Sequence, residues 1–71
     1  MIELNTFVIL RLEYLRSRQP HVLKEMEDDG VLKIHLFYTQ KRAGRKMELL
    51  VMAGMEESEA AEIVLREIIQ T

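Results

Sequence analysis

The residues best suited to binding chemistry are four cations close together in the sequence, Lys41, Arg42, Arg45 and Lys46. They belong to the segment 31–47, which contains no acidic residue. In a helix, Arg42, Arg45 and Lys46 share one face, and such a face can contact phosphate groups. The following segment, 48–71, holds six Glu and one Arg. The alternative is therefore that the two segments form neighbouring helices with solvated, ion-paired faces, which is the commoner arrangement.

The other titratable residues do not form a recognisable catalytic or metal-binding pattern. His35 could be a base or a metal ligand, but zinc needs three or four ligands, and the chain has no Cys and no second His within a turn. Glu56, Glu57, Glu59 and Glu62 form an acidic cluster at the exposed start of an expected helix, where solvation keeps carboxylates ordinary. Neither a G-x-S-x-G motif nor a Gly-rich phosphate loop occurs. We therefore predict a protein that is not an enzyme, with no catalytic residue, no metal and no cofactor.

Sparse Pro and Gly residues delimit the first two helices that we expect. Asn5 or Thr6 can N-cap a helix that reaches about Arg18. Pro20 suits the first position of a second helix, because its missing N–H is not needed there. Gly30 suits a left-handed C-cap at the end of that helix.

Two further helices are expected in the second half of the chain. A third helix runs from Val31 to about Met52, with a seam of apolar residues at heptad spacing, namely Leu36, Ala43, Met47 and Leu50. A fourth runs from Glu56 to about Gln70 and starts acidic, as a helix N-terminus prefers. Strands are an alternative at 6–12 and 31–39, which are rich in Val, Ile, Phe and Tyr, but no two-residue hairpin signal joins them. We predict an all-α fold, a small bundle of three or four short helices in one domain, 1–71.

The first helix carries apolar residues on more than one side. Leu4, Val8, Leu12 and Leu15 form one stripe, which we expect to face the core. Phe7, Arg11 and Tyr14 lie off that stripe, and we predict that they form a surface for a partner. A chain of 71 residues without Cys has a small core and no disulfide to stabilise it. We therefore expect a homodimer that shares the first or the long helix.

Charge and hydropathy indicate neither a membrane protein nor a strongly basic nucleic-acid binder. The formal net charge is −2, and the apolar runs are far shorter than the roughly 18 residues of a membrane span. No targeting segment is apparent, so we expect a cytoplasmic protein. Met47, Met52 and Met55 lie near Gly54 and could line an adaptable groove for a partner.

Several short patterns from Leu10 onward occur together at a characteristic spacing. The stretch LRLEYLRSRQP (10–20) reads Leu-Arg-x-x-Tyr-Leu-x-x-x-x-Pro, and 30–36 reads Gly-x-Leu-x-x-His-Leu. Gln40, Ala43, Arg45, Met47 and Glu48 follow, and AEIVLREII (61–69) closes the pattern. This spacing resembles the TnpV family of small transposon-encoded proteins, which are carried by conjugative elements of gut Firmicutes. The resemblance implies a helical accessory protein of a mobile element and supplies neither a catalytic residue nor a cofactor.

We therefore expect a non-enzymatic helical protein that acts through protein–protein contacts. The alternative is a DNA-binding or regulatory module that uses the basic face at 41–46.

Overall fold

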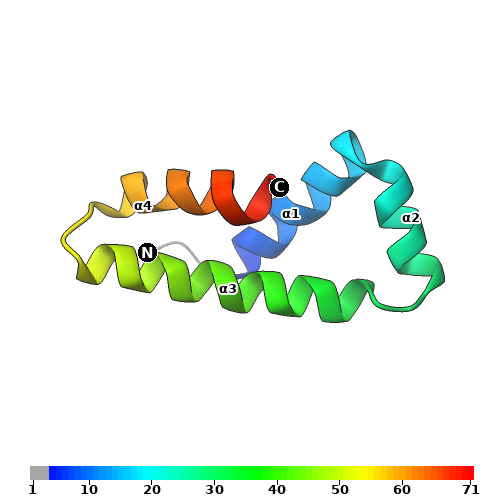
Figure 1. The fold of residues 1–71 in the computed structure, drawn as a ribbon, viewed down its shortest axis with the longest axis horizontal. Helices are drawn as coiled ribbons and strands as arrows, with labels where there is room; N and C mark the ends of the chain where they lie inside the picture. Colours follow the sequence, from blue (N-terminus) through cyan, green and yellow to red (C-terminus); the bar gives the residue numbers. More distant parts are fainter. Residues whose placement is uncertain (1–3) are drawn as a thin grey trace.

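The computed structural model describes residues 4–71, with side chains from Thr6 onward. This part of the chain belongs to the all-α class, and its helices are joined by short turns (Figure 1). The predicted all-α fold is confirmed. The helices are α1 (Leu4–Arg18), α2 (Pro20–Asp28), α3 (Leu32–Met52) and α4 (Glu57–Val64), and α4 continues as a π-helical turn, η1 (Leu65–Ile69). Of the two segments with an alternative strand pattern, 6–12 is helical, and 31–39 is helical from Leu32 onward.

The long helix α3 contacts every other helical element of the described residues. It runs along one edge of the molecule. The α4–η1 segment and the start of α1 pack against one face of α3, and α2 joins the C-terminal end of α1 to the N-terminal end of α3 (Figure 1). The result is an elongated body of 41 × 20 × 15 Å. Because only one side of α3 is covered by the other described helices, the opposite side faces outward.

Two glycines end helices in the left-handed conformation. Gly30 has φ +72° and Gly54 has φ +99°. In each case the N–H of the next residue bonds to a carbonyl five residues back, Val31 to Met26 at 3.0 Å and Met55 to Leu50 at 3.1 Å. The C-cap predicted at Gly30 is therefore confirmed. The predicted caps at Asn5 and Thr6 are wrong, because α1 already includes Leu4.

The core is formed between α3 and the helices that cover it. The buried side chains that contact one another are Phe7, Ala43, Met47, Ala60, Val64 and Ile69. The seam predicted on α3 is confirmed, with Ala43 and Met47 buried and Leu36 and Leu50 half-buried.

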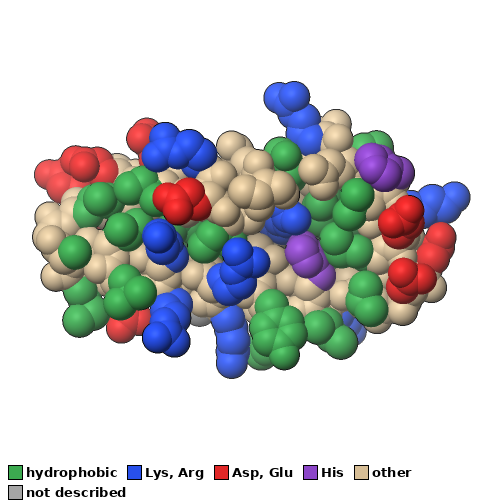
Figure 2. Space-filling model, viewed as in Figure 1, with side chains coloured by type: hydrophobic (Ala, Val, Ile, Leu, Met, Phe, Trp, Pro, Cys, Tyr) green, Lys and Arg blue, Asp and Glu red, His purple; other side chains and the backbone are tan. Residues whose placement is uncertain are grey.

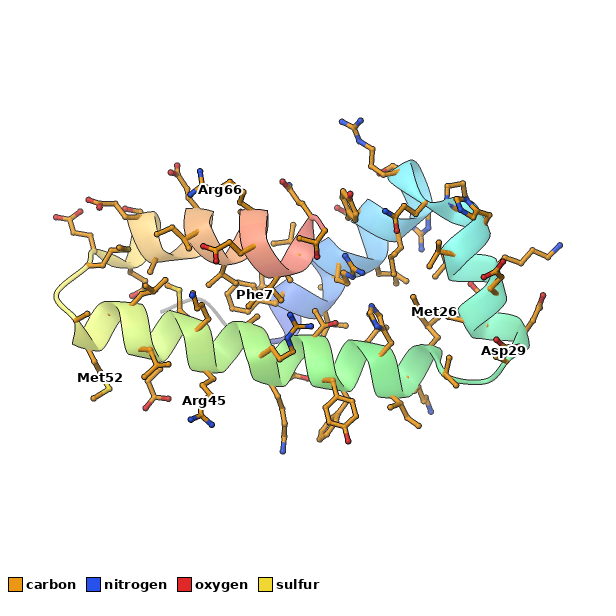
Figure 3. The ribbon with its side chains drawn as sticks, in the orientation of Figure 1. Phe7, Met26, Asp29, Arg45, Met52 and Arg66 are labelled. Carbon is orange, nitrogen blue, oxygen red and sulfur yellow. The ribbon has the colours of Figure 1, made fainter. Side chains whose placement is uncertain are left out.

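The buried face of α1 differs in part from the predicted one, although Leu15 of the predicted stripe is fully buried. Phe7, Arg11 and Leu15, four residues apart, are buried, whereas Val8 and Leu12 are half-buried. Phe7 is only 1% exposed and points between α3 and the α4–η1 segment (Figure 3). The reason is that α1 contacts both α3 and η1, so the face with the large Phe7 ring fills the space between them. The prediction that Phe7 and Arg11 lie on an outer surface is wrong.

Candidate functional site

Three features of the structure are candidate binding or reactive sites: the four predicted cations, the outer side of α3, and a buried arginine–histidine contact. Side chains of Lys and Arg gather over the middle of α3, whereas Asp and Glu gather toward the two ends of the molecule (Figure 2).

The four predicted cations point in different directions around α3. Lys46 Nζ lies 3.7 Å from Glu67 Oε1 of η1. Lys41 Nζ lies 4.9 Å from the centroid of the Phe37 ring, a cation–π contact. Arg45 points away from the bundle (Figure 3). The structure therefore engages part of the predicted basic face in contacts within the chain.

Arg42 lies on the side of α3 that faces α1. Its charge contributes to lowering the pKa of both Arg11 and His35. The four cations therefore belong to two neighbouring surfaces of α3: Lys41 and Arg45 lie on the outer side, and Arg42 and Lys46 lie toward the covering helices.

The outer side of α3 carries large apolar side chains that the bundle does not cover. They are Ile34, Phe37, Tyr38, Leu49 and Met52. Tyr38 is 59% exposed and Met52 is 76% exposed. The rings of Phe37 and Tyr38 pack edge to face, with centroids 5.7 Å apart, so they form one aromatic cluster.

These apolar residues form one continuous surface with Lys41 and Arg45. Positions 34, 38, 41, 45, 48 and 52 follow at spacings of three and four, on the side of the helix opposite the buried Ala43. We call this surface the α3 strip: Ile34, Phe37, Tyr38, Lys41, Arg45, Glu48, Leu49 and Met52. Its two ends are apolar and its centre is cationic, and Figure 2 shows apolar side chains on both sides of basic ones along this edge.

A groove borders the half of the α3 strip that is nearer its C-terminal end. Its volume is about 820 Å³, and its apolar lining includes Phe7, Met47, Val51 and Met52. Met47 and Met52 were two of the methionines predicted to line a groove; Met55 packs against the core instead.

Arg11 is a buried cation that joins three parts of the chain. Only 7% exposed, it donates from Nε to His35 Nε2 at 3.1 Å and from Nη1 to the carbonyls of Ile69 and Thr71 at 2.8 and 2.9 Å. The π-helical turn, closed by the bond from Gln70 N–H to the Leu65 carbonyl at 2.8 Å, ends at Ile69, the first of these acceptors. A cation at a helix C-terminus also stabilises the helix dipole.

The position of Arg11 lowers its pKa and places its guanidinium group near an aromatic ring. Burial lowers its pKa from the usual value, with an opposing contribution from Tyr14 and a smaller lowering from Arg42. Its guanidinium carbon lies 5.7 Å from the centroid of the half-buried Tyr14 ring.

Of the three predicted partner-surface residues, Phe7 and Arg11 are thus internal and Tyr14 is partly covered.

His35 acts as a hydrogen-bond acceptor in this contact. Because Arg11 can only donate, Nε2 of His35 must be unprotonated, and its ring proton lies on Nδ1. Burial lowers the pKa of His35, and the nearby charges of Arg11 and Arg42 lower it further. The carbonyl of His35 accepts the Thr39 hydroxyl proton at 2.8 Å. Within residues 4–71 no three His, Cys, Asp or Glu residues are arranged to hold a metal ion.

Sequence reasoning missed the α3 strip and the acceptor role of His35. A buried seam through Ala43 and Met47 places the strip on the opposite side of the same helix, but the seam does not determine whether other helices cover that side. The His35 contact had no local signal, since its donor is 24 residues away.

No helix among residues 4–71 is long and apolar enough to cross a membrane. Comparison of the chain with family models, with curated proteins and with solved structures finds no match in any of the three.

Proposed function

We propose that this protein is a non-enzymatic binding module that recognises a protein partner through the α3 strip. The observation that carries the proposal is the exposure of Ile34, Phe37, Tyr38, Leu49 and Met52 along one side of one helix. Exposed apolar residues scattered singly need no explanation, but large apolar residues grouped along one side of a helix are typical of an interaction site. Aromatic residues and Met are also enriched in protein–protein interfaces.

The proposed surface replaces the one expected on α1. Phe7 and Arg11 are occupied in contacts within the chain, so they are not available to a partner without opening the bundle. The α3 strip needs no such rearrangement. A role as a cytoplasmic accessory protein of a mobile element is part of the same proposal, and its support is the sequence spacing from Leu10 to Ile69.

A photo-crosslinking amino acid at position 38 tests the proposed function. With benzoylphenylalanine in place of Tyr38, irradiation in an extract of the source cells should give protein adducts of discrete mass. The same amino acid in place of Lys24, an exposed residue on α2, is the matched control. Equal adducts from both positions, or none from position 38, would contradict the proposal.

Homodimer formation is an alternative use of the same surface, and a direct measurement tests it. The support is the small size of the chain and its uncovered apolar surface. Static light scattering at about 10 µM and about 1 mM should show an increase in mass toward that of two chains if the α3 strip pairs with itself with a micromolar to millimolar dissociation constant. A constant monomer mass over this range would leave the strip to a different protein.

Nucleic acid is the alternative partner, and one observation favours it: Lys41 and Arg45 are exposed on a segment, 31–47, that contains no acidic residue. Fluorescence anisotropy of a labelled duplex at about 50 and about 200 mM salt tests it, because phosphate contacts give a log–log salt slope near −0.9 for each phosphate neutralised. Binding that is lost at the higher salt and in an Arg42→Ala, Arg45→Ala double variant would favour nucleic acid. Flat anisotropy at both salt concentrations would exclude it for that duplex.

A further inference from the structure

We propose that the partner of the α3 strip is an amphipathic helix with apolar residues toward both of its ends and acidic residues in its centre. This inference rests on the proposed function and specifies the chemistry of the partner. It follows from the order of side chains along the strip, from the length of the strip, and from the two exposed cations at its centre.

The strip has the dimensions of a helix-binding surface. Ile34 and Met52 lie on the same side of α3, and their separation of 18 positions corresponds to about 27 Å, or five helical turns, at 1.5 Å per residue. Partner helices bind to such surfaces through apolar residues at spacings of three and four. Here the apolar anchors form two groups, Ile34 with Phe37 and Tyr38, and Leu49 with Met52.

The cationic centre specifies the charge of the partner. Lys41 and Arg45 are one turn apart between the two apolar groups, and both are exposed. Lys41 is held over the Phe37 ring, so its position relative to the aromatic cluster is defined. The strip has one acidic residue, Glu48, which lies one turn after Arg45 and beside Leu49, so the centre keeps an excess of positive charge. A partner that covers this surface therefore needs carboxylates opposite its middle turns, because covering an unpaired charge is costly.

A second copy of the chain fits this order of charges less well. In an antiparallel pair centred on Ala43, which is midway between Ile34 and Met52, Lys41 of one copy lies opposite Arg45 of the other. Two such like-charge juxtapositions oppose the apolar contacts at the ends. An acidic-centred helix avoids this repulsion and keeps both apolar contacts.

Nucleic acid also fits less well, because it leaves the apolar ends of the strip unused. Single-stranded nucleic acid binds where cations accompany aromatic faces on which bases stack. One face of Phe37 is already in contact with Lys41, and the Tyr38 ring packs against Phe37 at an interplanar angle of 71°. Ile34, Leu49 and Met52 have no counterpart in a phosphate backbone.

Designed peptides test the inference on the complete protein. The probe is a labelled helical peptide of about 22 residues, which matches the strip at 1.5 Å per residue, with Leu at the contact positions of its end turns and Glu at those of its central turns. A peptide with Gln in place of the central Glu residues is the first control, and one with Lys there is the charge-reversed probe. Fluorescence anisotropy gives the dissociation constants.

Charge reversal on the protein provides the decisive comparison. The Lys41→Glu, Arg45→Glu double variant should bind the Glu-centred peptide about tenfold more weakly, since two exposed ion pairs are lost and repulsion replaces them. The same variant should bind the Lys-centred peptide more tightly than the unmodified protein does. Lys24→Glu, a charge reversal at another exposed position, on α2, should leave both dissociation constants unchanged. Far-UV circular dichroism checks that each variant is folded.

The outcomes separate this inference from the proposed function. Equal binding of the Glu- and Gln-centred peptides, or no binding of the Glu-centred peptide, would overturn the acidic-centred helix as the partner. Discrete crosslinks from position 38 would in that case still support a protein-binding strip. Binding of a labelled oligonucleotide in place of the peptide, with loss in the Lys41→Glu, Arg45→Glu variant, would overturn the inference in favour of nucleic acid.

Discussion

Arg11 of α1 donates the proton of its Nε to Nε2 of His35 on α3 across 3.1 Å, and the two residues are 24 positions apart in the sequence. This bond joins the two helices with the most extensive mutual contact in the described part of the chain. It exists only while the imidazole is neutral, because a protonated His35 has a donor on both nitrogens and adds a positive charge beside Arg11 and Arg42.

Stability should therefore fall as the solution is acidified. The pKa of His35 is lowered in the folded protein from its usual value of 6.5, so the unfolded chain binds the proton more readily. The stabilising contribution is complete above pH 6.5 and is lost as the pH falls from 6.5 through the lower folded pKa. Urea unfolding at a series of pH values between about 7.5 and about 5 measures this, across the usual range of histidine titration.

Two histidine variants isolate the source of that pH dependence. In His35→Gln the decline between neutral and mildly acidic pH should be reduced, because the group that gains a proton is gone. His21, exposed on α2, is the matched position, and His21→Gln should keep the wild-type profile. If His21→Gln removed the decline and His35→Gln did not, the assignment to the Arg11–His35 contact would be wrong.

Replacement of Arg11 should destabilise the end of the bundle more than its middle. In Arg11→Met the side chain keeps its length, but the carbonyls of Ile69 and Thr71 lose their shared donor. An unsatisfied buried polar group costs about 1–3 kcal/mol, so we expect a decrease of that size in the free energy of unfolding. Faster amide hydrogen exchange should appear first in residues 65–71.

Arg16→Met is the control for that prediction, because Arg16 is exposed on the same helix. It should change the free energy of unfolding by less than about 0.5 kcal/mol, as surface substitutions usually do. Unchanged exchange protection of residues 65–71 in Arg11→Met would show that Arg11 does not hold this segment.

The sequence predicted the helices well and the faces of α1 poorly, for a physical reason. Helix ends depend on local residues such as Pro20 and Gly30, whose backbone preferences act wherever the chain is placed. The buried face of α1 depends on acceptors at the other end of the chain. Arg11 reads as a surface residue in an amphipathic pattern, but the carbonyls of Ile69 and Thr71 make its burial favourable.

The α3 strip illustrates the same distinction. A heptad seam predicts which side of α3 is buried, and the structure confirms it through Ala43 and Met47. Whether the opposite side is covered depends on how many helices surround α3, which is a tertiary property. The apolar residues Ile34 and Tyr38 therefore read equally well as core or as surface until the bundle is assembled.

Gly30 should tolerate Asn better than Ala. Its φ of +72° is unfavourable for a side chain with a Cβ, although no atom lies within 4 Å of the position that a Cβ would take. Gly30→Ala should therefore cost about 1–2 kcal/mol through backbone strain alone. Asn visits this conformation more readily, so Gly30→Asn should cost less than Gly30→Ala. Thermal unfolding ranks the variants, and equal losses would contradict a strain-based origin.

Truncation of Phe7 should reduce stability, whereas truncation of Tyr38 should reduce binding, which separates the core of the bundle from the binding surface. Phe7 is buried against the core residues of α3 and α4, so Phe7→Ala should lose about 3–5 kcal/mol of stability, enough to unfold a domain of this size. Phe7→Leu, which keeps most of the volume, should remain folded with a smaller loss. Tyr38→Ala should change the free energy of unfolding by less than about 0.5 kcal/mol, because the Tyr38 ring is exposed.

The same Tyr38→Ala variant should bind the Glu-centred peptide at least about tenfold more weakly, since an aromatic anchor contributes strongly to binding once a partner covers it. Ile9→Ala is the control, because Ile9 is an exposed apolar residue on α1, outside the α3 strip. It should leave both stability and peptide affinity unchanged. A loss of affinity in Ile9→Ala equal to that in Tyr38→Ala would indicate general apolar adhesion and would exclude recognition by the α3 strip.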